Sequence, residues 1–538
     1  MKKIVANIIT DNAECIPEHP AIIDQGRKYT FLQHANRVRR LVNALQRVGC
    51  RRRDRIAVLS RNCAEYLEIY GACELGGFIA APVNYRLTAS EINYIVGNTT
   101  PSVMFYSAEF LPVIDEMRAV HTPHIQIHGA PASCISGAVG TVHTPHVQID
   151  GGELPEWAVP YNDFVDNGEA GPPAALASAD DPVYIVHTSG TTGKPKGAVL
   201  SQGAQYGVAQ GISSAAEITG NDRFLLVQPL FHVGAKFLQL AHHLRGAAIY
   251  IQREFNPAVV LDTLQTQRIT TLQLVPTMIE MLLADEYAES HNPAQVKTIF
   301  YSTAPIRETL LRKALAVFGP VFIQQYGSTE GGSVSNLSKN QHQPDGTGEQ
   351  QRRLLSAGQV CTGVEIKIVK SDGTVAATGE AGEVVVRHPD TMLEYWNDPQ
   401  ATAEAIRDGW LNMGDVGYLD EQGFLFIVDR KKDMIISGGE NIYPREVEIA
   451  LEQHQAVRHC AVIGIPDDRW GEAVCAFVVL SGECSEAELT EHCRTLIASY
   501  KKPKKIHFVE KLPRLATGKV DKVRLRAPYW QDRQTQVI

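Results

Sequence analysis

The chain has 538 residues, of which 44% are hydrophobic and 21% are charged, and its formal net charge is −9. A chain of this length exceeds what one hydrophobic core supports, so at least two domains are expected. The mild negative charge, without a long run of one sign, argues against a protein that binds nucleic acid or a membrane surface.

The N-terminal segment carries two lysines, Lys2 and Lys3, but its apolar stretch is short and is interrupted by Asn7. It therefore lacks the apolar core of a signal peptide, and no apolar run in the chain is long enough to cross a bilayer. The ten cysteines are scattered without a Cys-x-x-Cys pair, which favours reduced thiols over a zinc site or a disulfide framework. We expect a soluble, cytoplasmic protein with no integral membrane segment.

A near-exact repeat occurs once, because residues 120–127 recur as residues 142–149. A single recurrence excludes a solenoid. The His-Thr-Pro-His pair in each copy lacks a cysteine or carboxylate at the spacing expected for zinc. The repeat is better interpreted as a duplicated peripheral loop or hairpin.

The most informative stretch is residues 188–197, which follow the apolar run 183–186 and are rich in Gly, Ser, Thr and Lys. This pattern predicts a buried strand that leads into a loop whose amides, hydroxyls and ammonium groups can surround phosphate oxygens. A Walker A loop is excluded, since no glycine here has the required spacing to a Gly-Lys-Ser/Thr ending. A flexible linker fits less well, because linkers rarely place several hydroxyls and lysines directly after a buried strand. The stretch predicts a site for a nucleotide triphosphate.

Short apolar strands alternate with helix-length intervals in the middle of the chain, which predicts layered α/β structure. The expected strands are 224–227, 247–251, 271–275 and 321–325. Near residue 430 the pattern changes to a charged string, a Gly-rich turn and then a compact α+β pattern. The expected elements there are a helix at 444–454, strands at 461–465 and 474–480, a helix at 486–499 and a strand at 506–509. We expect a large N-terminal domain of layered sheets and helices, 1–429, and a small mobile α+β domain, 430–538.

Five motifs stand in the order seen in AMP-forming acyl-CoA synthetases, and together they cover nearly the whole chain outside the repeat. They are 188–197, Tyr326-Gly327-Ser328-Thr329-Glu330, 410–415, Asp429-Arg430 with 438–441, and 513–519. The chain thus resembles the adenylate-forming enzymes, which include firefly luciferase and peptide-synthetase adenylation domains. The resemblance implies ATP, Mg²⁺ and CoA as cofactors. It also implies a reaction in which a carboxylate attacks the α-phosphate, leaving acyl-AMP and pyrophosphate, before a thiol takes the acyl group.

The resemblance also assigns residues. It gives as catalytic residues Lys519, Glu330, Lys196 and His232. The positions implied to bind ATP or AMP are Thr188, Ser189, Gly190, Thr191, Thr192, Ser302, Thr303, Ala304, Pro305, Tyr326, Gly327, Ser328, Thr329, Asp415 and Arg430. Within that set Thr191 and Glu330 place Mg²⁺, Tyr326 stacks on adenine, and Asp415 accepts from the ribose hydroxyls with Arg430 nearby.

The same resemblance implies that Lys519 bridges the carboxylate and the α-phosphate after the C-terminal domain swings in, with Lys432 at the hinge. The implied pantetheine channel consists of Gly438, Gly439, Glu440 and Trp470, with Gly471 beside it. Free CoA is the expected acceptor, and a carrier protein is the alternative. A catalytically silent homologue is disfavoured, since Lys519, Glu330 and Asp415 are all present. A homodimer is left open.

The implied acyl pocket consists of His232, Gly234, Leu238, Tyr301 and Val334. Gly234 leaves space in apolar surroundings, so medium- or long-chain fatty acids are expected first and aryl or cinnamate-type acids second. Amino-acid activation is disfavoured, because no aspartate follows Phe231 where an ammonium would need one. Lys236 is expected to face solvent at a helix surface, and recognition of a second carboxylate on the substrate is the alternative.

Overall fold

The computed structural model describes residues 3–120, 146–172, 177–188, 195–284, 295–437, 440–514 and 519–530. Contacts group the chain into two compact units: unit 1 contains Met1–Glu365 and Val386–Leu411, and unit 2 contains Ile366–Val385 and Asn412–Ile538. This grouping differs from the expected boundary at residue 430, because residues 366–385 and 412–429 precede that boundary and yet belong to unit 2. That boundary stays a prediction.

The first sheet of unit 1 carries the predicted α/β alternation. In the described residues it has nine strands in the order β16-β15-β14-β13-β12-β10-β11-β1-β2. Its strands are β1 (Pro20–Asp24), β2 (Arg27–Thr30), β10 (Arg223–Leu226), β11 (Ala248–Ile251), β12 (Thr271–Leu274), β13 (Thr298–Tyr301), β14 (Phe322–Ser328), β15 (Gly332–Leu337) and β16 (Gln359–Val360). The strands from β11 to β14 pair in parallel and are largely buried, as apolar strands covered on both faces should be. The four strands expected in this region are confirmed.

The second sheet of unit 1 carries the phosphate-loop segment. Its eight strands in the described residues run in the order β19-β9-β8-β4-β3-β5-β6-β7. They are β3 (Arg55–Leu59), β4 (Ile79–Pro82), β5 (Val103–Tyr106), β6 (His146–Gln148), β7 (Ala158–Pro160), β8 (Pro182–Thr188), β9 (Lys196–Ser201) and β19 (Glu394–Tyr395). The end of the second repeat copy forms β6, which pairs with β5 and β7. Most of the repeat lies outside the described residues.

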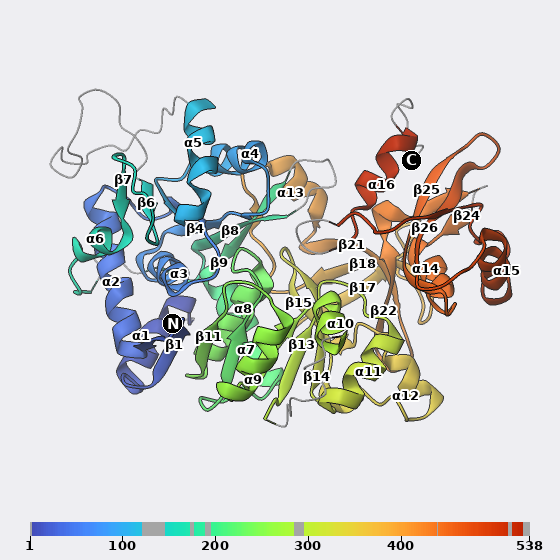
Figure 1. Ribbon diagram of the computed structural model, residues 1–538, viewed down its shortest axis with the longest axis horizontal. Helices are drawn as coiled ribbons and strands as arrows, with labels where there is room; N and C mark the ends of the chain where they lie inside the picture. The colour runs from blue at the N-terminus through green and yellow to red at the C-terminus, as the bar shows by residue number, and fades with distance from the viewer. Residues whose placement is uncertain are drawn as a thin grey trace. The chain divides into compact units, whose positions relative to one another are not determined.

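The helices of unit 1 cover the faces of these sheets; for example, α7 and α8 pack on each other, and α8 also lies against β10 and β11 (Figure 1). They are α1 (Val5–Cys15), α2 (Phe31–Arg47), α3 (Ala64–Gly76), α4 (Ala89–Thr99), η1 (Ala108–Phe110), α5 (Leu111–Val120), α6 (Tyr161–Asp166), α7 (Gln202–Ala215), α8 (Val233–His243), α9 (Pro257–Thr266), α10 (Pro276–Ala284), α11 (Glu308–Phe318), η3 (Lys339–Gln341), α12 (Gly348–Arg353) and α13 (Pro399–Ala405). None of the helices in the described part of the chain combines the length and apolar composition that a bilayer crossing requires.

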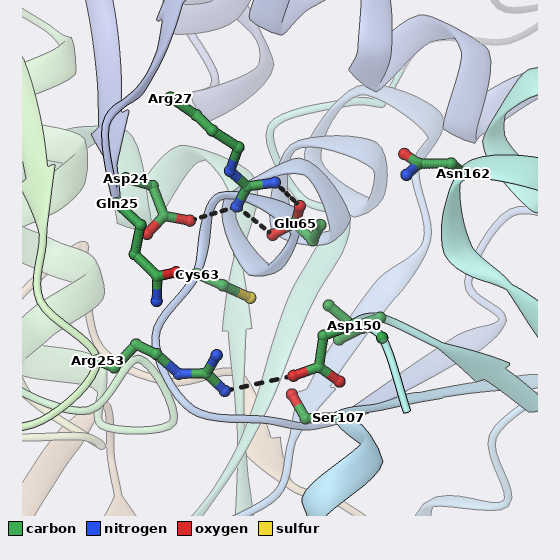
Figure 2. A pocket seen from close by; sticks show the side chains of 11 residues that line it. Asp24, Gln25, Arg27, Cys63, Glu65, Ser107, Asp150, Asn162 and Arg253 are labelled. Atoms are coloured by element: carbon green, nitrogen blue, oxygen red, sulfur yellow. Dashed lines mark hydrogen bonds and ion pairs between the residues drawn. The ribbon is translucent and has the colours of Figure 1, made fainter. Parts of the chain in front are cut away.

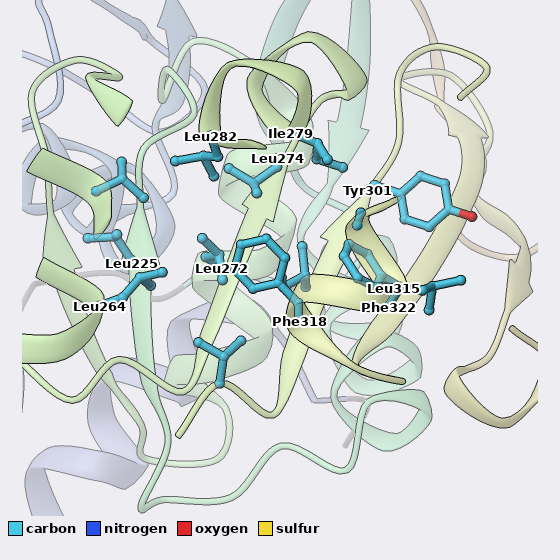
Figure 3. Packing of buried hydrophobic residues seen from close by; sticks show 14 of the residues in the cluster. Leu225, Leu264, Leu272, Leu274, Ile279, Leu282, Tyr301, Leu315, Phe318 and Phe322 are labelled. Carbon is cyan, nitrogen blue, oxygen red and sulfur yellow. The ribbon is translucent and has the colours of Figure 1, made fainter. Parts of the chain in front are cut away.

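One hydrophobic core lies between the nine-stranded sheet and helices α9 to α11 (Figure 3). Leu272 and Phe322 point into it from the strands, and Leu264 and Leu282 from the helices. All four side chains are nearly inaccessible to solvent. Apolar burial of this kind, worth roughly 25 cal/mol per Å², fixes the sheet whose strand ends carry the site.

Five strands between residues 365 and 430, not including β19, form a third sheet in the described residues, of order β17-β18-β21-β20 with β22 on β21. Its strands are β17 (Glu365–Val369), β18 (Gly382–Arg387), β20 (Ile406–Arg407), β21 (Trp410–Leu419) and β22 (Leu425–Arg430). The C-terminal elements are η4 (Lys431–Asp433), β23 (Ile435–Ser437), β24 (Glu440–Ile442), α14 (Pro444–Glu452), β25 (Val457–Asp467), β26 (Gly471–Leu480), α15 (Glu486–Leu496), β27 (Lys505–Phe508) and α16 (Lys522–Trp530). Helices α14 and α15 share a buried apolar cluster with β25 and β26. The α+β pattern expected after residue 430 is confirmed.

Candidate functional site

The loop predicted to hold phosphates spans the two strands β8 and β9. These strands are antiparallel, and Thr188 at the end of β8 pairs with Lys196 at the start of β9. Four of the predicted ATP-binding residues, Ser189, Gly190, Thr191 and Thr192, lie outside the described residues. The pairing of β8 with β9 therefore holds Thr188 and Lys196, at the two ends of the loop, opposite each other.

Glu330 occupies the tight turn between β14 and β15. A Cβ atom added to Gly327 would lie 2.0 Å from the carbonyl oxygen of Gly332, so the two backbones approach as closely as only glycine allows. The backbone N–H of Gly331 donates to Oγ of Ser328 at 2.9 Å, which tightens the turn further. The turn places the Glu330 carboxylate where Oγ1 of Thr188 donates to its Oε1 at 2.9 Å.

Tyr395 completes this group, and the sequence analysis missed it. Its hydroxyl donates to the same Glu330 oxygen at 3.0 Å, and Nζ of Lys196 lies 5.3 Å from the centre of its ring. Pairing of Tyr395 with Ala198 across β19 and β9 holds it there. Burial and the Glu330 charge raise the pKa of Tyr395 well above its ordinary value, so the phenol remains a donor.

These contacts join residues that are far apart in the sequence into one polar cluster of Thr188, Lys196, Glu330 and Tyr395. An ammonium group and a hydroxyl suit phosphate oxygens, and a carboxylate oxygen is the kind of ligand that Mg²⁺ takes. The donor set therefore fits a triphosphate with its magnesium ion. Glu330 would hold the ion.

The turn after β13 carries the predicted adenine contacts Ser302, Thr303, Ala304 and Pro305. Thr303 has φ +73°, a left-handed conformation that is rare for a β-branched residue and costs about 1–3 kcal/mol. Such strain is typical of functional sites. Tyr326 lies on β14 opposite Ser335, next to a register shift. Its stacking on adenine stays a prediction.

The predicted acyl pocket begins at α8, which starts after His232. A Cβ atom added to Gly234 would lie 3.3 Å from Nε2 of Gln273, so the Gln273 amide abuts this glycine. Nε2 of Gln273 donates to Oγ of Ser302 at 3.1 Å, whereas its buried Oε1 has no hydrogen-bond partner among the residues that the structure describes. Gln273 was missed from sequence, where a lone glutamine gives no signal. Leu238 and Val334 are fully buried.

Tyr301 is not placed with Gly234. In the parallel register Gln273 pairs with Phe300 and Leu274 pairs with Tyr301, and successive residues of a strand point to opposite faces. Phe300 therefore shares the face of Gln273. Tyr301 lies in the core cluster of Figure 3, and its hydroxyl is 3.0 Å from Nε2 of His342.

The expectation that Lys236 faces solvent is wrong. Its side chain is 3% exposed, and its Nζ lies 2.6 Å from Oε1 of Glu74 on α3. Nζ also donates to Gln239 at 2.6 Å and lies 4.6 Å from the ring centre of Tyr70. The Tyr184 hydroxyl donates to the same Glu74 oxygen at 2.6 Å. Burial lowers the pKa of Lys236, and the Glu74 charge opposes that shift.

In unit 2 the predicted ribose pair is adjacent. Asp415 on β21 pairs in register with Arg430 on β22, and Nε of Arg430 lies 2.9 Å from Oδ1 of Asp415. The Asp415 side chain is buried and that of Arg430 is exposed. The Asp415 carboxylate, held beside the Arg430 guanidinium, could accept hydrogen bonds from ribose hydroxyls. Ribose binding by this pair stays a prediction.

The remaining predicted residues of unit 2 are placed singly. Lys519 is half-buried beside the short bridge between Arg514 and Val520, and Lys432 is exposed in η4. Trp470 is 42% exposed, with Nζ of Lys504 4.9 Å from its ring centre. Glu440 is exposed at the start of β24. Gly438 and Gly439 lie outside the described residues.

A separate polar hollow of about 300 Å³ lies in unit 1 (Figure 2). Arg27 reaches Asp24 and Glu65 across it, and Arg253 reaches Asp150. So far as the structure describes the chain, Thr188, Lys196 and Glu330 do not line it. The hollow is therefore distinct from the cluster around Glu330. Its arginines pair with carboxylates of the same hollow.

Known proteins match both parts of the chain. A family model described as AMP-binding enzyme matches residues 9–396, and one described as AMP-binding enzyme C-terminal domain matches residues 446–519. An indoleacetate–CoA ligase of Aromatoleum aromaticum is 35% identical over 94% of this chain and 94% of its own length. A fatty acid–[acyl-carrier-protein] ligase of Streptomyces coeruleorubidus is 33% identical over 98% of this chain and 96% of its own.

A long-chain-fatty-acid–CoA ligase of Mycobacterium tuberculosis is 34% identical, with 93% of each chain covered. Among solved structures, the o-succinylbenzoate CoA synthetase of Bacillus subtilis in complex with its acyl-adenylate intermediate is 29% identical. Its TM-score is 0.81, with 96% of this chain and 97% of that chain covered. The chain therefore belongs to the AMP-binding enzyme family, as an adenylate-forming acid–thiol ligase.

Proposed function

We propose that this enzyme activates a medium- or long-chain fatty acid as its acyl-AMP and transfers the acyl group to CoA, releasing AMP and pyrophosphate. The observation that carries the reaction is the cluster of Lys196, Thr188, Glu330 and Tyr395. Two anions, carboxylate and α-phosphate, must meet in the first step, so the site has to supply positive charge and fixed donors. Mg²⁺, when bound, neutralises charge on the phosphates.

Other residues take the roles that the motifs predict. In this proposal Lys519 serves the first half-reaction, with Lys432 as the hinge. Asp415 and Arg430 hold the ribose. The pantetheine arm passes Gly438, Gly439, Glu440 and Trp470. A cytoplasmic location, where ATP and CoA are available, belongs to the same proposal.

The fatty-acid assignment draws on the apolar side chains of Leu238 and Phe300 and on the missing side chain at Gly234, where the Gln273 amide is the neighbouring polar group. Gln273 favours a second candidate, an aromatic acid that carries a hydrogen-bond donor. A substrate donor would pair with the buried Oε1 of Gln273 once the amide turned toward the pocket, whereas a methylene chain would leave that oxygen unpaired, at a cost of about 1–3 kcal/mol. The relatives include enzymes named for both kinds of acid.

A panel of linear and aromatic acids, read by pyrophosphate release with CoA present, tests the substrate. For fatty acids kcat/KM should rise about three- to fourfold per added carbon until the pocket is full, since each buried methylene is worth roughly 0.8 kcal/mol. Gly234→Phe should abolish activity on the longer acids and spare the short ones. If aromatic acids with a donor outpace every linear acid, and Gln273→Leu reverses that order, the second candidate replaces the first.

The acceptor is tested separately. Acyl-AMP supplied with free CoA should yield thioester, and a phosphopantetheinylated carrier protein should compete poorly. Faster transfer to the carrier than to CoA would favour the function named for the Streptomyces coeruleorubidus relative. Neither outcome bears on the acid, so the two parts of the proposal can fail independently.

A further inference from the structure

A histidine, a cysteine and a glutamate come together in unit 2, and none of them is among the residues proposed for the reaction. His454 lies between α14 and β25, Cys484 lies between β26 and α15, and Glu488 stands in the first turn of α15. One ligand atom of each residue lies within 4.8 Å of the other two. Sγ of Cys484 is 4.0 Å from Nδ1 of His454 and 3.6 Å from Oε2 of Glu488.

The fold itself produces this convergence. Strands β25 and β26 are antiparallel, and Val457 pairs with Leu480, so the segment before β25 and the segment after β26 leave the sheet at the same end. The N–H of Ser481 donates to the carbonyl of Ala456 at 2.8 Å, which holds the two segments together. Cys484 and Glu488 are four residues apart, and this spacing brings side chains to one side of a helix start.

We propose that His454, Cys484 and Glu488 bind one Zn²⁺ ion. Imidazole, thiolate and carboxylate are the three ligand types that zinc takes in proteins. Zinc bonds of about 2.3 Å to sulfur and about 2.0–2.1 Å to nitrogen or oxygen put tetrahedral ligands roughly 3.5 Å apart. The separations of 3.6 and 4.0 Å are close to that value, so small side-chain rotations would complete the geometry. Water would take the fourth position.

The hydrogen bonds that these three side chains make are long, so a metal ion could replace them at little cost. Nδ1 of His454 accepts from the N–H of Ala456 at 3.3 Å, and Oε2 of Glu488 accepts from the N–H and Oγ of Ser485 at 3.3 and 3.4 Å. Zinc binding would exchange these long hydrogen bonds for metal bonds, and the Cys484 thiol would lose its proton to solvent. A bound ion would tie the end of α14 to the start of α15.

The absence of a Cys-x-x-Cys pair favoured reduced thiols over a zinc site. The proposed site uses a single cysteine, and its histidine lies 30 residues away in sequence. A spacing rule built on paired cysteines does not detect such a site.

The test uses the full chain, freed of metal by a chelator and titrated with Co²⁺ and then Zn²⁺. Cobalt should bind with one equivalent per chain and give a thiolate-to-metal absorption band, which zinc then removes. Cys484→Ser should abolish the band and weaken zinc binding by at least about 100-fold, since even outer-shell partners are worth about 10–100-fold.

Glu488→Gln is a second variant that preserves the fold. Glutamine at this position still completes the capping box with Ser485, so the start of α15 should remain intact while one charged ligand is lost. Zinc affinity should fall by about tenfold or more. Glu491→Gln, on the same helix, and Cys15→Ser, at an exposed cysteine of unit 1, are the matched controls and should bind zinc like the unaltered chain.

The proposal is overturned if cobalt gives no thiolate band, or if Cys484→Ser binds zinc as tightly as the unaltered chain. Should Cys484→Ser fail to fold, Glu488→Gln decides the question. Unchanged zinc affinity in that variant overturns the proposal, and a selective loss relative to Glu491→Gln supports it.

Discussion

Removing one partner of the buried pair between Lys236 and Glu74 should destabilise unit 1 strongly. Lys236→Met keeps the length of the side chain but leaves the Glu74 carboxylate buried, with Tyr184 as its remaining hydroxyl donor. Breaking a buried ion pair in this way costs about 3–5 kcal/mol. Amides of α3 and α8 that exchange through opening of this region should then exchange about 100-fold faster or more.

The double variant Lys236→Met with Glu74→Gln separates the pair from the rest of the packing. The neutral amide can still accept from Tyr184, so the double variant should be more stable than the sum of the two single changes, by about 2 kcal/mol. Hydrogen exchange of α3 and α8 is the assay. Lys3→Met is the control, because Lys3 and its partner Asp11 are 62% and 52% exposed, and such surface pairs are worth about 0–1 kcal/mol. Strictly additive effects of the single and double variants would show that Lys236 and Glu74 do not stabilise each other.

Three further predictions follow from individual contacts. Burial raises the pKa of Asp390 to about 7, so the folded state holds a proton that the unfolded state has lost; stability should fall as pH rises from about 4 to 7, and urea titrations of Asp390→Asn should lack that slope. Thr303→Gly relieves the left-handed conformation and should be more stable than Thr303→Ala by up to about 1 kcal/mol in thermal unfolding; the reverse order would argue against strain there. Tyr395→Phe loses the hydrogen bond to Glu330 and should lower kcat/KM for ATP by about 3- to 10-fold, while Tyr500→Phe at an exposed position should not; equal kinetics for both would remove Tyr395 from the site.

Local patterns in the sequence predicted the strands of the α/β region and the elements after residue 430, because apolar periodicity and turn residues act over a few positions. The motifs likewise predicted that Thr188, Lys196 and Glu330 belong to one site. Tyr395 and Gln273 could not be found in this way, since each acquires its role from a partner more than 25 residues away. The Lys236 error has the same origin: its counter-charge, Glu74, lies on another helix, and no local pattern shows the pairing.

Strand alternation restricts which side chains can line the acyl pocket. Phe300 and Tyr301 are adjacent, and only one of them can face α8. The register of β12 and β13 puts Phe300 on the face of the sheet that Gln273 shares. That register depends on pairing between strands, which no local sequence pattern shows.

The proposed reaction is tested by a product analysis with ATP, Mg²⁺, CoA and a panel of fatty and aromatic acids, followed by mass spectrometry. We expect acyl-CoA, AMP and pyrophosphate in equal amounts with the preferred acid. We also expect Lys519→Ala to form no acyl-AMP yet still to convert supplied acyl-AMP and CoA into thioester. Formation of ADP and phosphate, or no acid-dependent pyrophosphate with any acid of the panel, would show that the enzyme does not form acyl-AMP.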